Sequence, residues 1–503
     1  MDTMTLEPRS ETAAPTPLAR EATARPAAQI EGRARTLALV SLLLASAMEL
    51  IDVTIVNVAL PTIERSLGAS GAMLQWVVAA YPLAFGISLI TGARLGDRFG
   101  RRRLFVIGLI GFTLASAACG LAPSALGLVA FRAVQGIAAA AMVPQVLTSI
   151  QVMYAAHERG KAMAAFSALA GIAAVVGPIL GAVLTETAGW RWVFLVNVPV
   201  GVLALVAALR FVPESRAAHA DRVDFRGVAV LTAGLLALLY PLVMGHELGW
   251  PAWSYAVLLA GALILAIFVV AEARHERSGD EPLLATSLYR DRAFAGGSLV
   301  GGLVFIAGTG YFLAGTLYFQ AGLGWSVLKA GLVNIPFALV CTVTAGAGAA
   351  MLMPRIGRRV LTLGAIVMAA GALVMWVTVR AADAQTSFWA FVPAISLVGA
   401  GFGFVVSSTA PLALVAVPDR QAGSASGQFN TTGQLANAVG AAVMGTLFFE
   451  VAASHAGPVP VEMFRPAHLA VLLVMAALLA VVALASRVIP AGAHEHADLA
   501  AGH

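Results

Sequence analysis

The stretch "MELIDVTIVNVALP", Met48 to Pro61, places two carboxylates inside an apolar run. Glu49 and Asp52 stand three residues apart, so a helix through this stretch carries both on one face. A charged side chain facing hydrocarbon costs about 2.5–3.5 kcal/mol or more, so that face must look onto water, a protein cavity or a cation. The stretch therefore predicts a membrane helix whose acidic face points into a protein.

The composition of the whole chain is that of a membrane protein. Of 503 residues, 59% are hydrophobic and 11% are charged, whereas soluble domains carry about 25% charged residues. Apolar windows of about 18 residues or more, long enough to cross a bilayer, recur along the sequence. We expect an all-α polytopic membrane protein with fourteen transmembrane helices, near residues 36–60, 74–93, 103–122, 125–150, 161–186, 191–211, 227–245, 253–273, 294–319, 329–353, 360–379, 387–417, 422–449 and 467–486.

These helices divide into two six-helix bundles, residues 36–211 and 293–487, with two inserted central helices and their loops in residues 212–292. The polar residues 1–35 are predicted to be a disordered cytoplasmic arm, and residues 488–503 a cytoplasmic tail. The loop sequences "GDRFGRRRLF" and "MPRIGRRVLT" occupy corresponding places in the two bundles. A duplicated six-helix half is a common transporter plan, with the substrate site between the halves near the membrane midplane.

The basic residues test this helix count, because Lys and Arg gather on cytoplasmic loops. With the N-terminus inside, 25 of the 31 fall on cytoplasmic loops and tails, five on outer loops, and one, Arg132, inside the fourth predicted helix. The net charge of +5 therefore reflects orientation in the inner membrane, with both termini cytoplasmic, and not nucleic-acid binding. Cys119 and Cys341 both lie in apolar segments, so we expect packing and no disulfide or metal site.

Arg132 is the natural partner of the acidic pair. At 1.5 Å per residue, Asp52 lies roughly 13 Å below Pro61 and Arg132 roughly 10 Å below Ala125, so the two sit at similar depth. Proximity of two acids and partial loss of water favour protonation, and an Arg that stays charged can be released when its carboxylate takes a proton. A proton-coupling site at Asp52, Glu49 and Arg132 is one interpretation. A purely structural salt bridge, or an Arg that only joins helices, is the alternative.

Four motifs resemble those of the major facilitator superfamily, in its fourteen-helix drug:proton antiporter family. They are "LIDVTIVNVALP" in the first helix, "GARLGDRFGRRRLF" in the loop after the second, "RAVQGIAAAAMVP" in the fourth and "AVVGPILGAVL" in the fifth. "WRWVFLVNVPVG", Trp190 to Gly201, is similar to the same family pattern. Ala93, Ala173 and Ala182 depart from it, since the family usually has Gly there. The resemblance implies that Asp52 is the principal acid.

The resemblance also implies roles for two of these motifs. The loop after the second helix would latch the cytoplasmic side in the outward-open state, through Gly92, Asp97, Arg98, Gly100, Arg101 and Arg102. The fifth-helix motif, with Gly177, Pro178 and Gly181, would favour antiport over symport. The residues themselves allow plainer interpretations, because the arginines also act as orientation signals and the small residues permit close helix packing.

A substrate cavity is harder to predict, because such cavities are mostly apolar. The candidate lining residues are polar or aromatic side chains within the predicted spans: Trp76, Tyr81, Gln135, Tyr311, Gln320, Asn334 and Asn430. The second bundle places no acid deep in a helix, which favours a narrow or less strictly cationic substrate range.

The sequence thus predicts proton-driven efflux of a small amphipathic drug or antibiotic by alternating access, conferring resistance. The alternatives are a proton-coupled symporter or uniporter for a small metabolite, and a non-transporting membrane sensor or structural protein. No phosphate-binding Gly-x-x-x-x-Gly-Lys-Ser/Thr sequence occurs, so this chain does not use ATP itself. We expect no enzyme activity, cofactor or metal, and a monomer whose partners are the drug, protons and the lipid bilayer.

Overall fold

The computed structural model describes residues 32–154, 156–216, 224–278, 282–383, 385–417, 421–455 and 460–490. Most of these residues are helical, with no strand among them, and thirteen helices are long and apolar enough to cross a membrane. The helix at Ala156–Thr187 is not among these thirteen, and its apolar part, Val176–Thr187, is shorter; with this helix the number of spans is fourteen. The predicted fold class is confirmed. Most of the predicted arm and tail, residues 1–31 and 491–503, lies outside the described residues.

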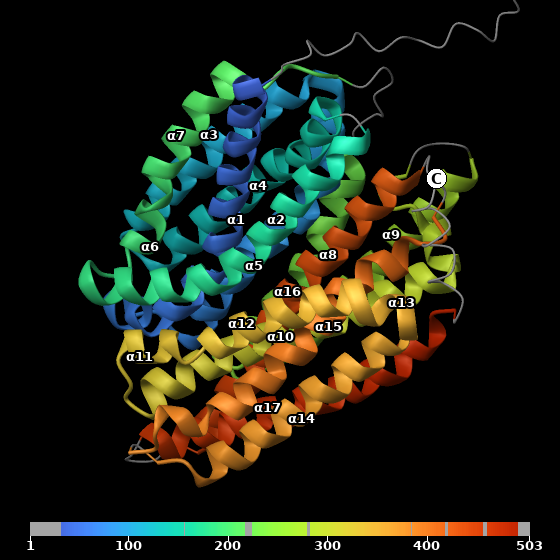
Figure 1. The fold of residues 1–503 in the computed structure, drawn as a ribbon. Helices are drawn as coiled ribbons and strands as arrows, with labels where there is room; N and C mark the ends of the chain where they lie inside the picture. The colour runs from blue at the N-terminus through green and yellow to red at the C-terminus, as the bar shows by residue number, and fades with distance from the viewer. Residues whose placement is uncertain are drawn as a thin grey trace, which may run out of the picture.

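Figure 1 shows two groups of helices with an inserted pair beside them. The first group comprises α1 (Gly32–Leu67), α2 (Gly71–Phe99), α3 (Arg101–Gly120), α4 (Ala125–Met153), α5 (Ala156–Thr187), α6 (Trp192–Leu195) and α7 (Asn197–Phe211). The inserted pair is α8 (Phe225–Met244) and α9 (Ala252–Arg277). The second group comprises α10 (Arg292–Leu317), α11 (Val327–Leu332), α12 (Ile335–Ala347), α13 (Met353–Ile356), α14 (Arg359–Ala381), α15 (Val392–Leu414), α16 (Ala422–Ser454) and α17 (Pro460–Ala485).

Short polar side chains start several of these helices by accepting hydrogen bonds from otherwise unpaired backbone N–H groups. Ser124 accepts from Gly127 N at 3.2 Å at the start of α4, and Asp291 accepts from Ala293 N at 2.8 Å at the start of α10. Such caps matter most where a helix begins at the edge of a membrane, since the apolar run that follows offers the backbone no other partner.

Two helices differ from the predicted ranges. The predicted helix 329–353 is broken, because α11 ends at Leu332 and a new helix begins at Ile335 with Pro336 in its first turn, a position where its missing N–H is harmless. The first span is longer than predicted and contains Pro61, after which it continues to Leu67. The depth of Asp52 counted from Pro61 is therefore an underestimate.

The two groups touch at the end of the molecule opposite the ends of the described chain. Gln320 Nε2 donates to Val58 O at 2.8 Å, and Leu328 N donates to Glu186 Oε2 at 2.7 Å. A Cβ on Gly331 would lie 2.5 Å from Ala182 Cβ, so α11 and α5 approach closely there. Figure 1 shows the groups in contact beside α11 and splayed apart toward α13.

The repeated loop motif has the same backbone device in both groups. Gly100 follows α2 with φ +111°, and Gly357 follows α13 with φ +54°. Residues that carry a side chain rarely adopt such positive backbone angles. An arginine after each glycine donates to a carbonyl near the end of the last helix of its group: Arg102 to Leu209 O, and Arg358 to Arg487 O at 2.7 Å. The weak sequence repeat therefore corresponds to a structural one.

Candidate functional site

Asp52 lies at the centre of a buried hydrogen-bonded cluster between α1, α4 and α7. Its side chain is 0% exposed, and its Oδ2 is ion-paired with Arg132 Nη1. Its Oδ1 accepts hydrogen bonds from Gln135 Nε2 and from Asn197 Nδ2, both at 2.9 Å. Every oxygen of this carboxylate thus has a donor, which offsets the large cost of removing a charge from water.

Arg132 joins this cluster to the rest of the first group. Besides Asp52, its Nη1 donates to Gln135 Oε1 at 2.8 Å, so the amide orients both charged groups. The guanidinium carbon lies 4.5 Å from the centroid of the Tyr81 ring, at cation–π distance. The sequence separation between Asp52 and Arg132 is 80 residues, and the pairing predicted from helix depth is the one that the fold forms.

Glu49 occupies the same face of α1, one turn before Asp52, and is buried at 5% exposure. Its Oε1 accepts a hydrogen bond from Tyr81 OH at 3.2 Å. Among the described residues Glu49 has no ion pair. The carboxyl groups of Glu49 and Asp52 therefore lie near a single guanidinium, that of Arg132. Tyr81 contacts both Glu49 and Arg132 and links the two parts of the cluster.

Small residues of α5 hold that helix against α1 beside this cluster. A Cβ on Gly177 would lie 1.9 Å from Thr54 Oγ1, and one on Gly181 would lie 2.7 Å from Ile55 Cγ1. Pro178 lies between them in the sequence and lines a cavity between the two groups of helices. Close packing at Gly177 and Gly181 is therefore a feature of this structure, whatever further role the motif has in antiport.

A cavity of about 240 Å³ lies between the two groups and reaches the charged cluster. The first group contributes polar atoms to its wall, from Asn57, Tyr81 and Arg132 among others. The second group contributes the aromatic rings of Phe305, Phe312, Phe337 and Phe402 and the polar side chains of Thr309, Thr316, Asn334 and Asn437. An apolar wall facing a few polar groups is typical of sites for small amphipathic molecules. A second cavity of about 210 Å³, between α10, α15 and α16, shares Phe305 and Asn437 with it.

The predicted cavity residues fall in several places. Tyr81 and Asn334 line the central cavity, and Asn430 lines the second cavity. Gln135 belongs to the Asp52 cluster, and Tyr311 lies behind the wall, stacked on Phe337 with ring centroids 6.4 Å apart.

The remaining two lie further away. Gln320 donates a hydrogen bond to Val58 O at the end of the molecule where the two groups touch. Trp76 packs with apolar residues of α8 and α16. Neither is among the residues that line the two cavities.

The predicted latch residues lie at the splayed end, in the last turns of α2, at Gly100 and in the first turn of α3. Asp97 Oδ1 accepts from Arg101 Nε at 3.0 Å and Nη2 at 2.7 Å, so this ion pair lies within the loop motif. Gly92 touches α4, since a Cβ there would lie 2.0 Å from Ala140 O. Arg98 stands over the ring of Phe99 at 5.4 Å. These contacts lie within the first group, whereas Arg94 of the same motif donates from Nη2 to Pro282 O, in the segment between α9 and α10.

Asn197 and Ser116 are members of the cluster that were not singled out from the sequence. Asn197 Nδ2 bonds both Asp52 Oδ1 and Ser116 Oγ, each at 2.9 Å. The sequence does mark Asn197 as a candidate for a buried polar contact, because its amide stands in the otherwise apolar run "FLVNVPVG". An amide in a membrane helix needs a partner, but the sequence does not say on which other helix that partner lies.

Three side chains at the base of the inserted pair, Asp224, Glu272 and His275, place ligand atoms within 4.8 Å of one another. Both carboxylates already act as backbone caps: Asp224 Oδ1 accepts from Gly227 N at 2.9 Å, and Glu272 Oε2 accepts from Leu284 N at 2.8 Å. Asp224 thereby caps the start of α8, and Glu272 holds the segment that follows α9.

Comparison with known proteins places this geometry in a family context. The sequence profile of the Major Facilitator Superfamily matches residues 42–441. The probable actinorhodin transporter of Streptomyces coelicolor is 39% identical over 82% of this chain and 72% of its own length. The puromycin resistance protein of Streptomyces alboniger is 35% identical over 81% of each chain. The tetracenomycin C resistance and export protein of Streptomyces glaucescens is 32% identical over 84% and 77%.

Solved structures share the fold at lower identity. A bacterial homologue of the human lysosomal transporter Spinster, in an inward-facing and unoccupied conformation, has a TM-score of 0.64 at 16% identity, covering 92% of this chain and 98% of its own. A D-xylose–proton symporter has a TM-score of 0.60 at 16% identity, covering 88% and 97%. At these identities the likeness concerns the arrangement of helices alone.

Proposed function

Because the chain belongs to the major facilitator superfamily, we propose that it exports a small amphipathic drug or antibiotic across the cell membrane in exchange for inward-moving protons. Several relatives that share about a third of its residues are named for the export of, or resistance to, such compounds. The single observation that carries the coupling is the buried Asp52–Arg132 pair, which reaches the wall of the central cavity through Arg132.

The splayed end of the molecule is the cytoplasmic end in this proposal. It is the end at which α1 begins and where the loop "GDRFGRRRLF" lies, and Arg-rich loops face the cytoplasm. The contacts between Gln320 and Val58 and between Leu328 and Glu186 then close the outer side. The conformation is inward-facing, ready to accept substrate from the cytoplasm or the inner leaflet.

A charge count supports a one-proton site. Glu49 and Asp52 can carry two negative charges, and Arg132 carries one positive charge, so the cluster is electrically neutral when it holds one proton. A buried cluster is far less costly when neutral, because each uncompensated buried charge costs several kcal/mol. Loading or releasing a proton therefore changes how firmly Arg132 is held.

Transport follows from that change. When Asp52 takes a proton, Arg132 loses its ionic partner and turns toward the cavity; when Asp52 loses the proton, it recovers Arg132. The apolar body of the substrate packs on the aromatic wall, and its polar groups compete for Asn57, Tyr81 or Arg132. Proton binding at Asp52 and substrate binding in the cavity thus both act on Arg132. Alternating access arises as the two groups rock about the cavity.

The test uses purified protein in liposomes with an imposed pH gradient and a panel of puromycin, tetracenomycin C and actinorhodin. Uptake into vesicles in exchange for protons is expected for at least one compound, and movement of substrate in the same direction as protons would indicate symport instead. Asp52→Asn should abolish gradient-driven exchange while retaining substrate–substrate exchange. Asn57→Ala, a cavity change with no ion pair, should alter affinity and keep the coupling. Unchanged gradient-driven exchange in Asp52→Asn would remove Asp52 from the mechanism.

A further inference from the structure

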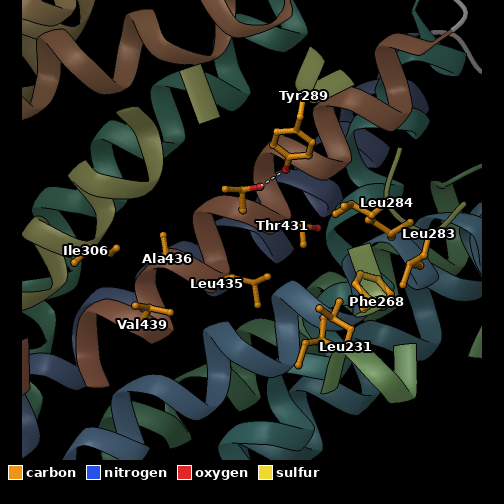
Figure 2. Close-up of a pocket in the computed structure, with 13 residues that line it drawn as sticks. Leu231, Phe268, Leu283, Leu284, Tyr289, Ile306, Thr431, Leu435, Ala436 and Val439 are labelled. Carbon is orange, nitrogen blue, oxygen red and sulfur yellow. Dashed lines mark hydrogen bonds between the residues drawn. The ribbon is translucent and has the colours of Figure 1, made fainter. Parts of the chain in front are cut away.

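An apolar pocket of about 310 Å³ lies under the inserted helices, apart from the central cavity. Figure 2 shows its wall, to which Leu231 of α8, Phe268 of α9 and Leu435 of α16 contribute. Ile87 and Ile90 of α2 complete the side that belongs to the first group. No residue that lines this pocket lines either of the two cavities described above.

The pocket lies within the membrane, toward the splayed end. Leu231 comes six residues after the start of α8 at Phe225, which places it about 9 Å along the helix. Leu283, Leu284 and Tyr289, from the segment between α9 and α10, close the pocket on the side of that end. A compound dissolved in the leaflet at this end lies at the same depth.

One polar atom in this wall has no partner. Thr431 is 3% exposed, and among the described residues its Oγ1 makes no hydrogen bond. The neighbouring Thr432 differs, since its hydroxyl donates to Gln428 O at 2.9 Å and lies 3.2 Å from Tyr289 OH. Figure 2 shows the Thr431 oxygen directed from α16 toward Leu284, across the pocket. A buried hydroxyl without a partner is costly, so a ligand that supplies one is favoured.

We propose that this pocket is a second ligand site, which binds a compact membrane-soluble amphiphile with an apolar body and one hydrogen-bonding group. The body packs between α2, α9 and α16, and the polar group pairs with Thr431 Oγ1. A lipid acyl chain suits the pocket less well, because it would leave that hydroxyl unpaired. The site does not depend on the export activity, since it needs only the pocket and the hydroxyl.

The place of the pocket gives the inserted helices a role. Leu231 and Phe268 form the part of its wall contributed by α8 and α9, while α2 and α16 come from different groups. A bound molecule therefore touches both groups and the inserted pair at once. Its affinity changes whenever the two groups move relative to each other, which makes the site sensitive to conformation.

The test compares 1-naphthol, a compact aromatic with one hydroxyl, with 1-methylnaphthalene, which has a methyl group instead. Each is titrated by fluorescence against the protein in nanodiscs, with protein-free nanodiscs subtracted. The wild type should bind 1-naphthol about 3- to 10-fold more tightly, the range expected for one hydrogen bond. Thr431→Val should remove that preference, and the matched control Thr432→Val, whose hydroxyl is already paired, should keep it.

A second variant locates the binding. Ala436→Phe fills this pocket and should abolish the component of 1-naphthol binding that Thr431→Val weakens, whereas Ala410→Phe, in the separate 210 Å³ cavity, should not. The proposal is overturned if the preference survives in Thr431→Val, or if Ala436→Phe leaves all binding intact. It is also overturned if 1-naphthol fails to bind the wild type and Ala436→Phe instead releases a co-purified phospholipid. Should Ala436→Phe not fold, the Thr431→Val comparison decides alone.

Discussion

The two six-helix groups share a plan but differ in what they bury. The first group buries Asp52, Glu49 and Arg132 with amide and hydroxyl partners around them. The second group places rings on the wall of the central cavity, and several of its buried polar atoms, including Tyr311 OH and both nitrogens of His468, have no partner among the described residues. One group is built around satisfied charges and the other around aromatic surface.

This difference separates two tasks. A satisfied charged cluster can change state when one proton arrives, because every partner must then rearrange. An aromatic wall offers large apolar contact without a fixed hydrogen-bond pattern, so it accepts molecules of varied shape. We therefore expect changes in the charged cluster of the first group to affect coupling and stability, and changes in the aromatic rings of the second group to affect substrate affinity. Variants of Arg132, Phe337 and His468 test that division.

The largest effect is expected from Arg132→Leu. The change leaves Asp52 buried with two amide donors and no cation, and breaking a buried ion pair in this way costs about 3–5 kcal/mol. The free energy of unfolding, measured in mixed SDS micelles, should fall by that amount. Adding Asp52→Asn should restore most of the loss, since the second change removes the uncompensated charge. A double variant no more stable than Arg132→Leu would show that the pair is not the source of the effect.

In the second group, Phe337→Ala should weaken substrate binding with little effect on coupling. Phe337 lines the cavity and packs against Phe312 with ring centroids 5.0 Å apart. Loss of such a ring should lower affinity at least about 10-fold. The number of protons exchanged per substrate should stay unchanged, as measured by parallel proton and substrate fluxes in liposomes.

The matched control is Phe391→Ala, which removes a ring buried in the same group but away from the cavity, against Phe319 and Trp325. It should lower stability and leave affinity unchanged. If both variants lose affinity equally, the loss comes from general loosening of the second group and not from the cavity wall.

The repeated turn allows a smaller comparison. Gly100→Ala and Gly357→Ala both force a side chain into a backbone region with positive φ, at about 1–3 kcal/mol each. At Gly100 the added Cβ would also lie 2.6 Å from Glu214 Oε1, so this variant should be the less stable of the two. Thermal unfolding of both variants checks the order, and equal melting temperatures would mean that Glu214 moves aside.

The two groups also differ in how much of their structure could be predicted from the sequence. Helix number, the pairing of Asp52 with Arg132 and the correspondence of the two loop motifs followed from hydropathy, charge placement and motif, because each depends on local pattern or on depth. The rest of the cluster did not, since Asn197 meets Asp52, and Ser116 meets Asn197, only through the packing of α1, α3 and α7. The residues of the cavity wall could not be predicted either, because nothing in the sequence distinguishes Phe305 and Phe337 from other apolar residues of a membrane span.

The smallest effect is expected at His468, a titratable residue that the division leaves without a coupling role. It is 0% exposed, stacks on Tyr318 with ring centroids 5.0 Å apart and planes at 7°, and has no hydrogen bond among the described residues. His468→Phe keeps the stacked ring and removes two unpaired nitrogens, so it should raise the free energy of unfolding by about 1 kcal/mol. Proton exchange should be unaltered. A loss of coupling in this variant would place a proton-carrying group in the second half and break the division of tasks.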